Sequence, residues 1–404
     1  MHPISQNDRQ MITVPKADGT FIQADMVKNW DEEKWMKEFR FLGEAEMHYL
    51  VLASPDKLAL GVVDMCLKTA QKSGFRVFLG IQYDDAWWKK GSKDKSWLFE
   101  QMRIGSRIAD NLYEKYHNKY PDSFYGWYFA YEVDNVKFNR RKKFKLLAEG
   151  IDILLEHLRM NGHRLPIMLS PFMKSAWGKA RDYAANWAWL FNDTELGEGD
   201  IFCPQDSVGS GGLKMNELDE WFGQLKKAVD TKPGLLFWAN TENFDHRYWS
   251  SAPLNRFLQQ MEIVSRYVDN IITFSYSHYY SPNNIEGRFH EMYLDYLKTG
   301  SLQEAELKPP AKLTVKRLGL NGHRIAWEET ENPTSIFGYE LFRNGKKVFG
   351  TYEQRKYGGK PQGKVHGYMD RNILKWRPWG IVYEVRAIDF AGNASKKIKA
   401  KVFI

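Results

Sequence analysis

Apolar runs alternate with amphipathic stretches between residues 20 and 300, and this alternation restricts the possible folds more than any other feature. The predicted strands are Thr20–Ala24, Met47–Ala53, Arg76–Tyr83, Phe124–Tyr131, Leu165–Leu169, Ile201–Pro204, Gly234–Ala239 and Ile271–Tyr276. Helices are predicted between them, for example at Asp31–Phe41, Lys57–Lys72, Ser96–Tyr116, Lys143–Met160 and Leu254–Tyr267. Continuously apolar strands separated by helices are typical of a parallel sheet covered by helices. Eight such units predict an α/β fold of the (β/α)8 TIM-barrel type.

The structural alternative is a doubly wound open sheet. Such a sheet usually has fewer strands and a Gly-rich first turn, and the first turn here, Asp25–Trp30, contains no glycine.

A second domain follows the predicted barrel. The stretch Ser301–Pro310 is polar, ends in two prolines and predicts a linker between a barrel over residues 1–305 and a small module over residues 309–404. Short alternating strands are predicted in this module at Lys312–Val315, Arg324–Trp327, Tyr339–Arg343, Lys346–Phe349 and Tyr383–Ile388. The pair Asn344–Gly345 predicts a hairpin turn. We therefore expect an all-β sandwich that makes few contacts with the barrel and is dispensable for its chemistry.

Charge and cysteine content exclude several classes of protein. Residues 309–404 hold 19 Lys and Arg against 8 Asp and Glu, so the net charge of +8 belongs to the module and not to the barrel. The excess leaves two interpretations open, an anionic polysaccharide as partner or a solvated lysine-rich sandwich. No basic helix or RNA-binding strand motif indicates nucleic acid. Cys66 and Cys203 are predicted to be buried free thiols, and no apolar stretch is long enough to span a membrane.

Two predicted strands end in the same unusual way. The segments FYGWYFAYEVDN (124–135) and GLLFWANTENFD (234–245) each begin apolar and end in polar residues around one glutamate, Glu132 and Glu242. Catalytic groups of a barrel lie at the C-terminal ends of its strands, and two such glutamates are the minimum for paired-carboxylate chemistry. The alternative for either glutamate is a helix cap or an ion pair with a lysine.

Other polar and aromatic residues are expected on the same rim. Amides and carboxylates bind sugar hydroxyls, and flat aromatic rings stack on sugar rings. The predicted substrate-binding residues are Asp25, Asp84, Trp87, Trp88, Asn135, Gln205, Asp206, Asn240, Tyr276 and His278. Asp84 fits a turn residue equally well, and His278 fits a structural histidine. The GSGG run at 209–212 predicts a flexible turn, and the dispersed histidines predict no metal site and no cofactor.

The adjacent tryptophans Trp87 and Trp88 lie in a polar loop just beyond the third predicted strand. Adjacent side chains project in different directions, so we expect one indole to pack inward and the other to form a sugar platform. The alternative is that both rings close the loop over the following helix.

Glutamates at the ends of strands four and seven resemble the pattern of the large clan of retaining (β/α)8 glycoside hydrolases. The segments GWYFAYEVDN, CPQDSVG and FWANTENF, within a resemblance that covers about residues 15–300, are also similar to a glycosidase-like barrel family of unknown function from glycan-degrading bacteria. The resemblance implies that Glu132 is the acid/base and Glu242 the nucleophile. The chain departs from the clan at Tyr131, where an Asn is usual, in lacking an Arg near the end of strand two, and in the additional carboxylate of Asp206. The C-terminal module resembles a fibronectin type III, immunoglobulin-like sandwich through Trp327, Tyr339 and YEVRAIDFAGNAS (383–395).

These observations favour a glycoside hydrolase that cleaves an oligo- or polysaccharide, with retention of configuration as the expected course. The alternatives are a non-catalytic carbohydrate-binding protein on the same barrel and a scaffold that presents the sandwich. We expect a monomer located in the periplasm or outside the cell, although MHPISQNDRQ shows no signal peptide. The sugar, the linkage, inversion as the other stereochemical course and a role of Asp206 in place of one glutamate stay open.

Overall fold

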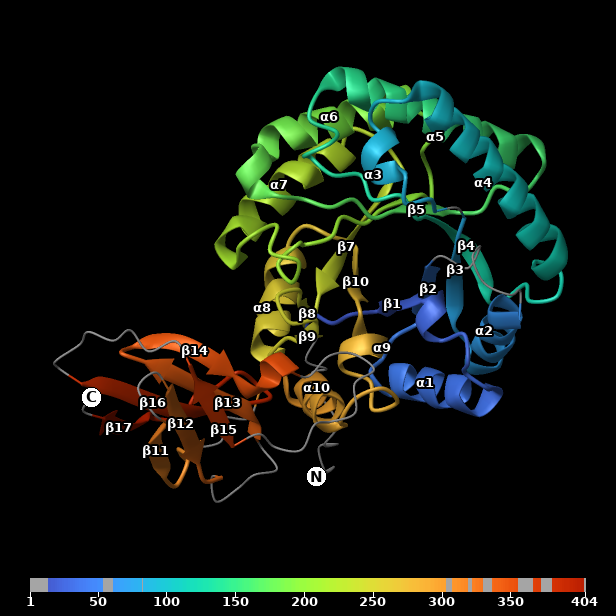
Figure 1. Ribbon diagram of the computed structural model, residues 1–404. Helices are drawn as coiled ribbons and strands as arrows, with labels where there is room; N and C mark the ends of the chain where they lie inside the picture. Colours follow the sequence, from blue (N-terminus) through green and yellow to red (C-terminus); the bar gives the residue numbers. More distant parts are fainter. Residues whose placement is uncertain are drawn as a thin grey trace, which may run out of the picture.

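Eight parallel strands form a closed barrel in the order β1-β10-β7-β6-β5-β4-β3-β2 (Figure 1). The computed structural model describes residues 14–53, 61–81, 83–302, 307–318, 322–329, 336–354, 366–371 and 380–402. The barrel strands are β1 (Gly19–Gln23), β2 (Tyr49–Ala53), β3 (Arg76–Gly80), β4 (Phe124–Phe129), β5 (Ile167–Leu169), β6 (Ile201–Phe202), β7 (Leu236–Glu242) and β10 (Asn270–Phe274). Because β1 pairs with both β2 and β10, the sheet closes, and the alternative of an open sheet is wrong.

Helices surround the barrel on its outer face (Figure 1). The long helices are α1 (Glu32–Glu44), α2 (Gly61–Ser73), α4 (Lys95–Tyr116), α5 (Arg141–Met160), α6 (Ala180–Asp193), α7 (Leu218–Val229), α8 (Leu254–Val264) and α10 (Arg288–Thr299). Short helices follow several strands: η1 (Ala24–Met26), α3 (Trp87–Lys90), η3 (Ser175–Trp177), η4 (Met215–Glu217) and α9 (Tyr276–Tyr279). Side-chain caps begin two of the long helices, since Asp31 accepts from Lys34 N and Asp94 accepts from Trp97 N.

The barrel interior is a packed layer of apolar side chains. Its buried members are Phe21, Val51, Phe78, Tyr128, Ala130, Met168, Ile201, Cys203, Trp238 and Ile272. Side chains two residues apart on a strand point to the same face of the sheet. The inward-facing residues of each strand therefore indicate which residues further along the same strand also point inward. Continuing from Tyr128 and Trp238 in steps of two reaches Glu132 and Glu242, at the C-terminal mouth of the barrel.

The C-terminal module consists of two antiparallel sheets. One contains β11 (Leu313–Leu318), β12 (Gly322–Trp327) and β15 (Gly367–Asp370), and the other contains β14 (Lys346–Gly350), β13 (Ile336–Arg343), β16 (Ile381–Asp389) and β17 (Ile398–Val402). Asn344 and Gly345 adopt positive φ angles of 50° and 78° between β13 and β14, which confirms the predicted hairpin. Part of the predicted linker, residues 303–306, lies outside the described residues.

The module packs against the barrel, and the expectation that few contacts cross this boundary is wrong. Phe289 of α10 makes edge-to-face contacts with Phe337 and Phe390 of the module, at centroid distances of 5.3 and 4.9 Å.

The module also caps the N-terminus of α8, whose first N–H groups have no acceptor within the helix. Leu254 N donates to Phe390 O and Asn255 N donates to Ala391 O, each at 3.0 Å.

Two further predictions concern the chain as a whole. Cys66 and Cys203 are buried free thiols, as expected. Across the described ranges, no helix combines the length and apolar character that a membrane crossing needs.

Candidate functional site

Glu132 lies three residues beyond the end of β4, with its side chain half-buried. Its Oε1 accepts a hydrogen bond of 3.0 Å from Gln205 Nε2, and the same amide group donates to Ser170 O at 3.3 Å. Burial raises the pKa of Glu132 above its ordinary value, and the nearby Asp134 carboxylate raises it further, against the opposing effect of the Gln205 hydrogen bond. The buried surroundings therefore favour the protonated form of Glu132.

Glu242 is the last residue of β7, and only 1% of its surface is exposed. Its Oε2 accepts a 2.6 Å hydrogen bond from Ser210 N, in the loop that follows β6. This loop packs directly on the glutamate: a Cβ added at Gly209 would lie 2.4 Å from Phe244 O and 2.8 Å from Glu242 Cβ. The GSGG run therefore packs closely against Glu242.

The peptide group that joins Gly209 to Ser210 is hydrogen-bonded at both ends. Its N–H donates to Glu242, and its carbonyl oxygen accepts from the backbone N of His246 at 2.9 Å and from His246 Nδ1 at 2.8 Å. The imidazole lies over Gly211, where an added Cβ would be 2.5 Å from His246 Cε1. Donation to the carbonyl polarises the peptide, so His246 strengthens the N–H that holds the Glu242 carboxyl group.

A buried network supports Glu242 from behind. Asp206 Oδ1 accepts from Val208 N at 3.1 Å and Glu242 N at 3.3 Å, and its Oδ2 accepts from Gln260 Nε2 at 2.5 Å. Gln260 and Arg256, both on α8, donate to Glu242 O at 2.9 and 3.0 Å. Burial and the Asp206 carboxylate raise the pKa of Glu242, while Ser210 and Arg256 act in the opposite direction. Burial also raises the pKa of Asp206.

Asp206 therefore holds the backbone N–H of Glu242 through Oδ1 and the side chain of Gln260 through Oδ2, so that both carboxylate oxygens have protein partners. This bears on the question of whether Asp206 replaces one of the glutamates. An oxygen that already accepts from protein donors in a fully buried position is poorly placed to meet a sugar.

Asn240 contacts the strands that carry this group, and His278 contacts the end of β1. Asn240 Nδ2 donates to Ser170 Oγ at 3.2 Å, and the main chain of Asn240 pairs with that of Gln205. His278 is buried in α9, which follows β10, and its Nε2 accepts from Gln23 N at 3.2 Å. Burial lowers the pKa of His278 to about 3, so the imidazole is neutral in the physiological range.

Four other predicted residues are not drawn into the group around the glutamates. Tyr276 is buried on the helix side, with its hydroxyl 2.9 Å from His290 Nδ1. Asn135 exchanges two 2.9 Å hydrogen bonds with the main chain of Lys174. Asp84 accepts from Ala86 N at 2.7 Å, which is the turn-residue alternative, and Asp25 is exposed on η1.

Trp87 is not a sugar platform, because its ring is buried. It stacks on Tyr131 at 4.7 Å and on Phe138 at 5.3 Å, and its Nε1 donates to Glu132 O at 2.7 Å. Trp88 is partly buried and donates to Tyr83 Oη at 2.9 Å. Trp87 thus fixes the main chain of Glu132 from the helix side.

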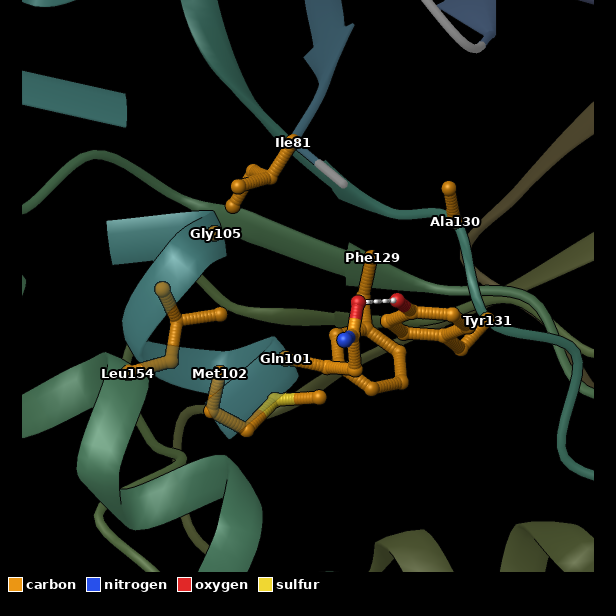
Figure 2. Close-up of a pocket in the computed structure, with 8 residues that line it drawn as sticks. All are labelled: Ile81, Gln101, Met102, Gly105, Phe129, Ala130, Tyr131 and Leu154. Carbon is orange, nitrogen blue, oxygen red and sulfur yellow. Dashed lines mark hydrogen bonds between the residues drawn. The ribbon is translucent and has the colours of Figure 1, made fainter. Parts of the chain in front are cut away.

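Tyr131 also points away from the barrel mouth. Figure 2 shows its hydroxyl meeting Gln101 of α4 at 3.1 Å, beside a small, mainly apolar pocket. The pocket is lined by Ile81, Gln101, Met102, Gly105, Phe129, Ala130, Tyr131 and Leu154. It lies between β4 and the helices, behind Glu132, so a side chain at position 131 cannot contact a sugar held at the mouth.

Sequence reasoning missed the exposed apolar side chains on the rim. Met26 after β1, Trp177 after β5 and Trp249 after β7 are 40%, 60% and 53% exposed. Trp249 belongs to a small hairpin of β8 (Phe244–Asp245) and β9 (Ser250–Ser251). A tryptophan in the charged run DHRYW just beyond Glu242 is the signal that could have identified it.

A family described as a domain of unknown function, DUF4434, matches residues 17–286. No curated protein matches the chain. Among solved structures, an endo-β-1,4-mannanase from Thermotoga petrophila is 10% identical, with 96% of this chain and 98% of that chain covered and a TM-score of 0.45. A β-galactosidase from Marinomonas ef1 is 10% identical, with 64% of this chain and 54% of that chain covered and a TM-score of 0.45. A chitinase from Bacillus thuringiensis is 9% identical, with 97% of this chain and 85% of that chain covered and a TM-score of 0.40. Identities this low carry no activity over to this chain. Within the described ranges, no group of three His, Cys, Asp or Glu residues could hold a metal ion.

Proposed function

The chain belongs to the DUF4434 family of unknown function, and we propose that its barrel is a glycoside hydrolase that uses Glu132 and Glu242 to cleave an oligo- or polysaccharide. The observation that carries the proposal is the arrangement of the two glutamates. Glu242 is the last residue of β7 and Glu132 lies three residues beyond β4. These two strands are separated in the ring by β5 and β6, and both glutamates follow inward-facing residues of the barrel layer. Burial raises the pKa of both glutamates, with further contributions from Asp134 at Glu132 and from Asp206 at Glu242.

Glu132 suits the role of acid/base. Gln205 occupies Oε1, which leaves Oε2 to carry the proton, and burial raises the pKa of Glu132 in the direction that an acid needs. In the first step Oε2–H protonates the glycosidic oxygen, so that the C–O bond breaks and the leaving sugar departs as an alcohol.

Glu242 suits the role of nucleophile when it is ionised. Ser210 N–H holds Oε2, so Oε1 is the oxygen that attacks the anomeric carbon and forms a glycosyl–enzyme ester. Glu132, now a carboxylate, then removes a proton from water. The resulting hydroxide attacks the anomeric carbon, expels Glu242 and gives a sugar of retained configuration.

The experiment is a screen against aryl glycosides and plant and host glycans, with Glu132→Gln and Glu242→Gln as test variants. We expect losses of kcat/KM of at least about 100-fold for each variant. The Glu132 variant should retain more activity on substrates whose leaving group needs no proton. Asp122→Asn is the matched control, because it removes an exposed carboxylate just before β4, at the opposite end of that strand from Glu132. Turnover that survives both Gln substitutions would exclude this mechanism.

A carbohydrate-binding protein without catalysis is the second candidate, and one observation favours it. Glu242 is covered by the loop at 209–212, whereas a nucleophile has to reach an anomeric carbon. A purely binding site would hold oligosaccharides without turnover and would tolerate Glu242→Gln with little change in affinity.

A further inference from the structure

The hairpin of β8 and β9 begins two residues beyond Glu242 and carries Trp249. The indole ring is parallel to that of Phe244, with an interplanar angle of 2° and a centroid distance of 5.5 Å. Phe244 therefore covers one face of the indole. The residue as a whole nevertheless remains 53% exposed.

Trp249 is held firmly although it is exposed. Phe244 is buried, stacks on Tyr279 at 5.4 Å and has its carbonyl oxygen bound by Arg256 Nη2 at 2.6 Å. The neighbouring Tyr248 makes an edge-to-face contact with Tyr352 of the C-terminal module.

The backbone of Trp249 has φ 51°, in the left-handed region that bulky residues avoid. Such strain persists only where surrounding contacts impose it, and it is found preferentially at functional sites. A rigid, exposed indole loses little entropy when a ring stacks on it.

We propose that Trp249 is a stacking platform for a pyranose ring of the carbohydrate chain, beside the sugar that reaches Glu242. This inference rests on the function proposed above and names a subsite of it. The C–H face of a pyranose packs well on a flat π surface. Asp245 and Arg247 on the hairpin pair with each other, with Arg247 Nη2 at 2.5 Å from Asp245 Oδ2, so this pair offers no net charge to a ligand and favours an uncharged sugar. A β-linked chain of equatorial pyranoses presents the flat faces that this surface accepts.

The test uses the full chain carrying Glu242→Gln, so that bound sugar is not hydrolysed, with cellohexaose, mannohexaose and xylohexaose as probes. Calorimetry gives the Kd of each hexaose before and after Trp249→Ala. We expect Kd to rise about five- to tenfold, the effect of one aromatic stacking contact. Trp249→Phe, which keeps a ring, should restore most of the affinity. Trp189→Ala, on the outer helix α6, is the matched tryptophan control and should leave Kd unchanged.

A second measurement reports on Trp249 without any turnover. In protein labelled with 5-fluorotryptophan, the Trp249 resonance is identified by its absence from the Trp249→Phe spectrum. The hexaose that binds most tightly should shift this resonance and leave that of Trp189 in place. Thermal melting of Trp249→Ala should stay close to that of the parent, because the side chain is largely exposed.

The two proposals fail in different ways. An unchanged Kd and an unmoved Trp249 resonance, in a protein that still hydrolyses glycans, would overturn the platform and leave the hydrolase standing. A shifted resonance and a raised Kd without hydrolysis by the wild-type chain would support the platform and remove the catalytic function. If none of the three hexaoses binds, the platform for neutral β-linked pyranoses is overturned.

Discussion

At the scale of single residues, the raised pKa of Glu242 has a consequence for stability. A carboxyl group whose pKa is higher in the folded than in the unfolded chain binds its proton more tightly when folded. Its contribution to stability is therefore present below the unfolded pKa and is lost as pH rises through the folded pKa. Burial and Asp206 produce this shift at Glu242, so the charged form opposes folding above its ordinary pKa of about 4.5.

Glu242→Gln should accordingly stabilise the folded chain at pH 8 more than at pH 4.5. One unit of pKa shift is worth about 1.4 kcal/mol, so we expect Tm at pH 8 to rise by a few degrees. Melting curves of both proteins between pH 4.5 and 8.5 measure this directly. Glu220→Gln, at an exposed position on α7, is the control and should leave the difference near zero at every pH. A Glu242→Gln protein that is less stable at pH 8 would contradict the expectation.

His246 supports a second prediction, through the peptide between Gly209 and Ser210. Removing the Nδ1 donor leaves the carbonyl oxygen of Gly209 with the backbone N–H of His246 alone. The Ser210 N–H then binds the Glu242 carboxylate less strongly, and the pKa of Glu242 rises further. His246→Ala should thus move the acid limb of the kcat/KM profile to higher pH and lower the maximum about tenfold.

His246→Gln provides the matched control, since its side-chain amide can donate to the same carbonyl oxygen. We expect it to bring the acid limb back towards the wild-type position. Equal pH profiles for the Ala variant and the wild-type chain would show that the imidazole does not position the glutamate.

The sequence predicted the orientation of single side chains only where the alternation of a strand determines it. Glu132 and Glu242 continue the inward-facing positions of β4 and β7, so reading the strand ends was sufficient to find both. Ser210 and His246 are brought to Glu242 by the conformation of two loops, and no spacing of residues in the sequence predicts that conformation. The polar loop did not reveal which of Trp87 and Trp88 packs inward, because the buried stack of Trp87 on Tyr131 and Phe138 forms only in the folded chain.

At the scale of elements, α8 connects the C-terminal module to Glu242. The helix begins after Pro253, and its first free N–H groups donate to carbonyl oxygens of a turn in the module. Two turns of the same helix carry Arg256 and Gln260, which bind Glu242 O. A shift of that turn therefore displaces the backbone of the proposed nucleophile.

Gly392→Ala tests this connection. Gly392 has φ 100°, and an added Cβ would lie 2.6 Å from Asn255 Oδ1 and 2.7 Å from Pro253 Cβ. We expect a lower Tm and a loss of kcat of about tenfold or more with little change in KM. Gly345→Ala is the matched control: its φ of 78° imposes backbone strain of the same kind, but nothing lies within 4 Å of the added Cβ. It should lower stability by about 1 kcal/mol and leave kcat unchanged.

The barrel strands were predictable because each is a short apolar run that repeats at regular intervals. Several ends shifted by a few residues; β7 extends to Glu242, whereas the pattern predicted its end at Ala239. The hairpin of β8 and β9 was not predictable, since each of its strands has two residues and no periodicity. Phe244 stacks on both Trp249 and Tyr279 and so fixes the position of the hairpin. These three residues do not follow the two-residue spacing by which a strand is recognised.

At the scale of the whole molecule, two domains share one buried cluster. The sequence predicted the boundary from the polar linker and its prolines, and from these features it also predicted independence. The expectation of few contacts is wrong because a linker describes only the part of the chain that crosses the boundary, whereas the dispensability of the module for chemistry stays a prediction. Phe337 and Phe390 are buried with Phe289 of the barrel, which no feature of residues 301–310 reveals.

Removal of residues 307–404 should therefore weaken the barrel itself. Phe289 would be exposed, and the first turn of α8 would lose the acceptors that Phe390 and Ala391 supply. We expect the fragment of residues 1–306 to retain a barrel with a lower Tm, and hydrogen exchange in α8 to become faster than in α5, which lies away from the module. Phe390→Ala in the full chain is a smaller change at the same interface, and we expect it to lower the free energy of unfolding by about 3 kcal/mol or more. Should the fragment melt at the temperature of the full chain and keep its kcat/KM, the module would be the independent unit that the linker suggested, and α8 would hold Glu242 without it.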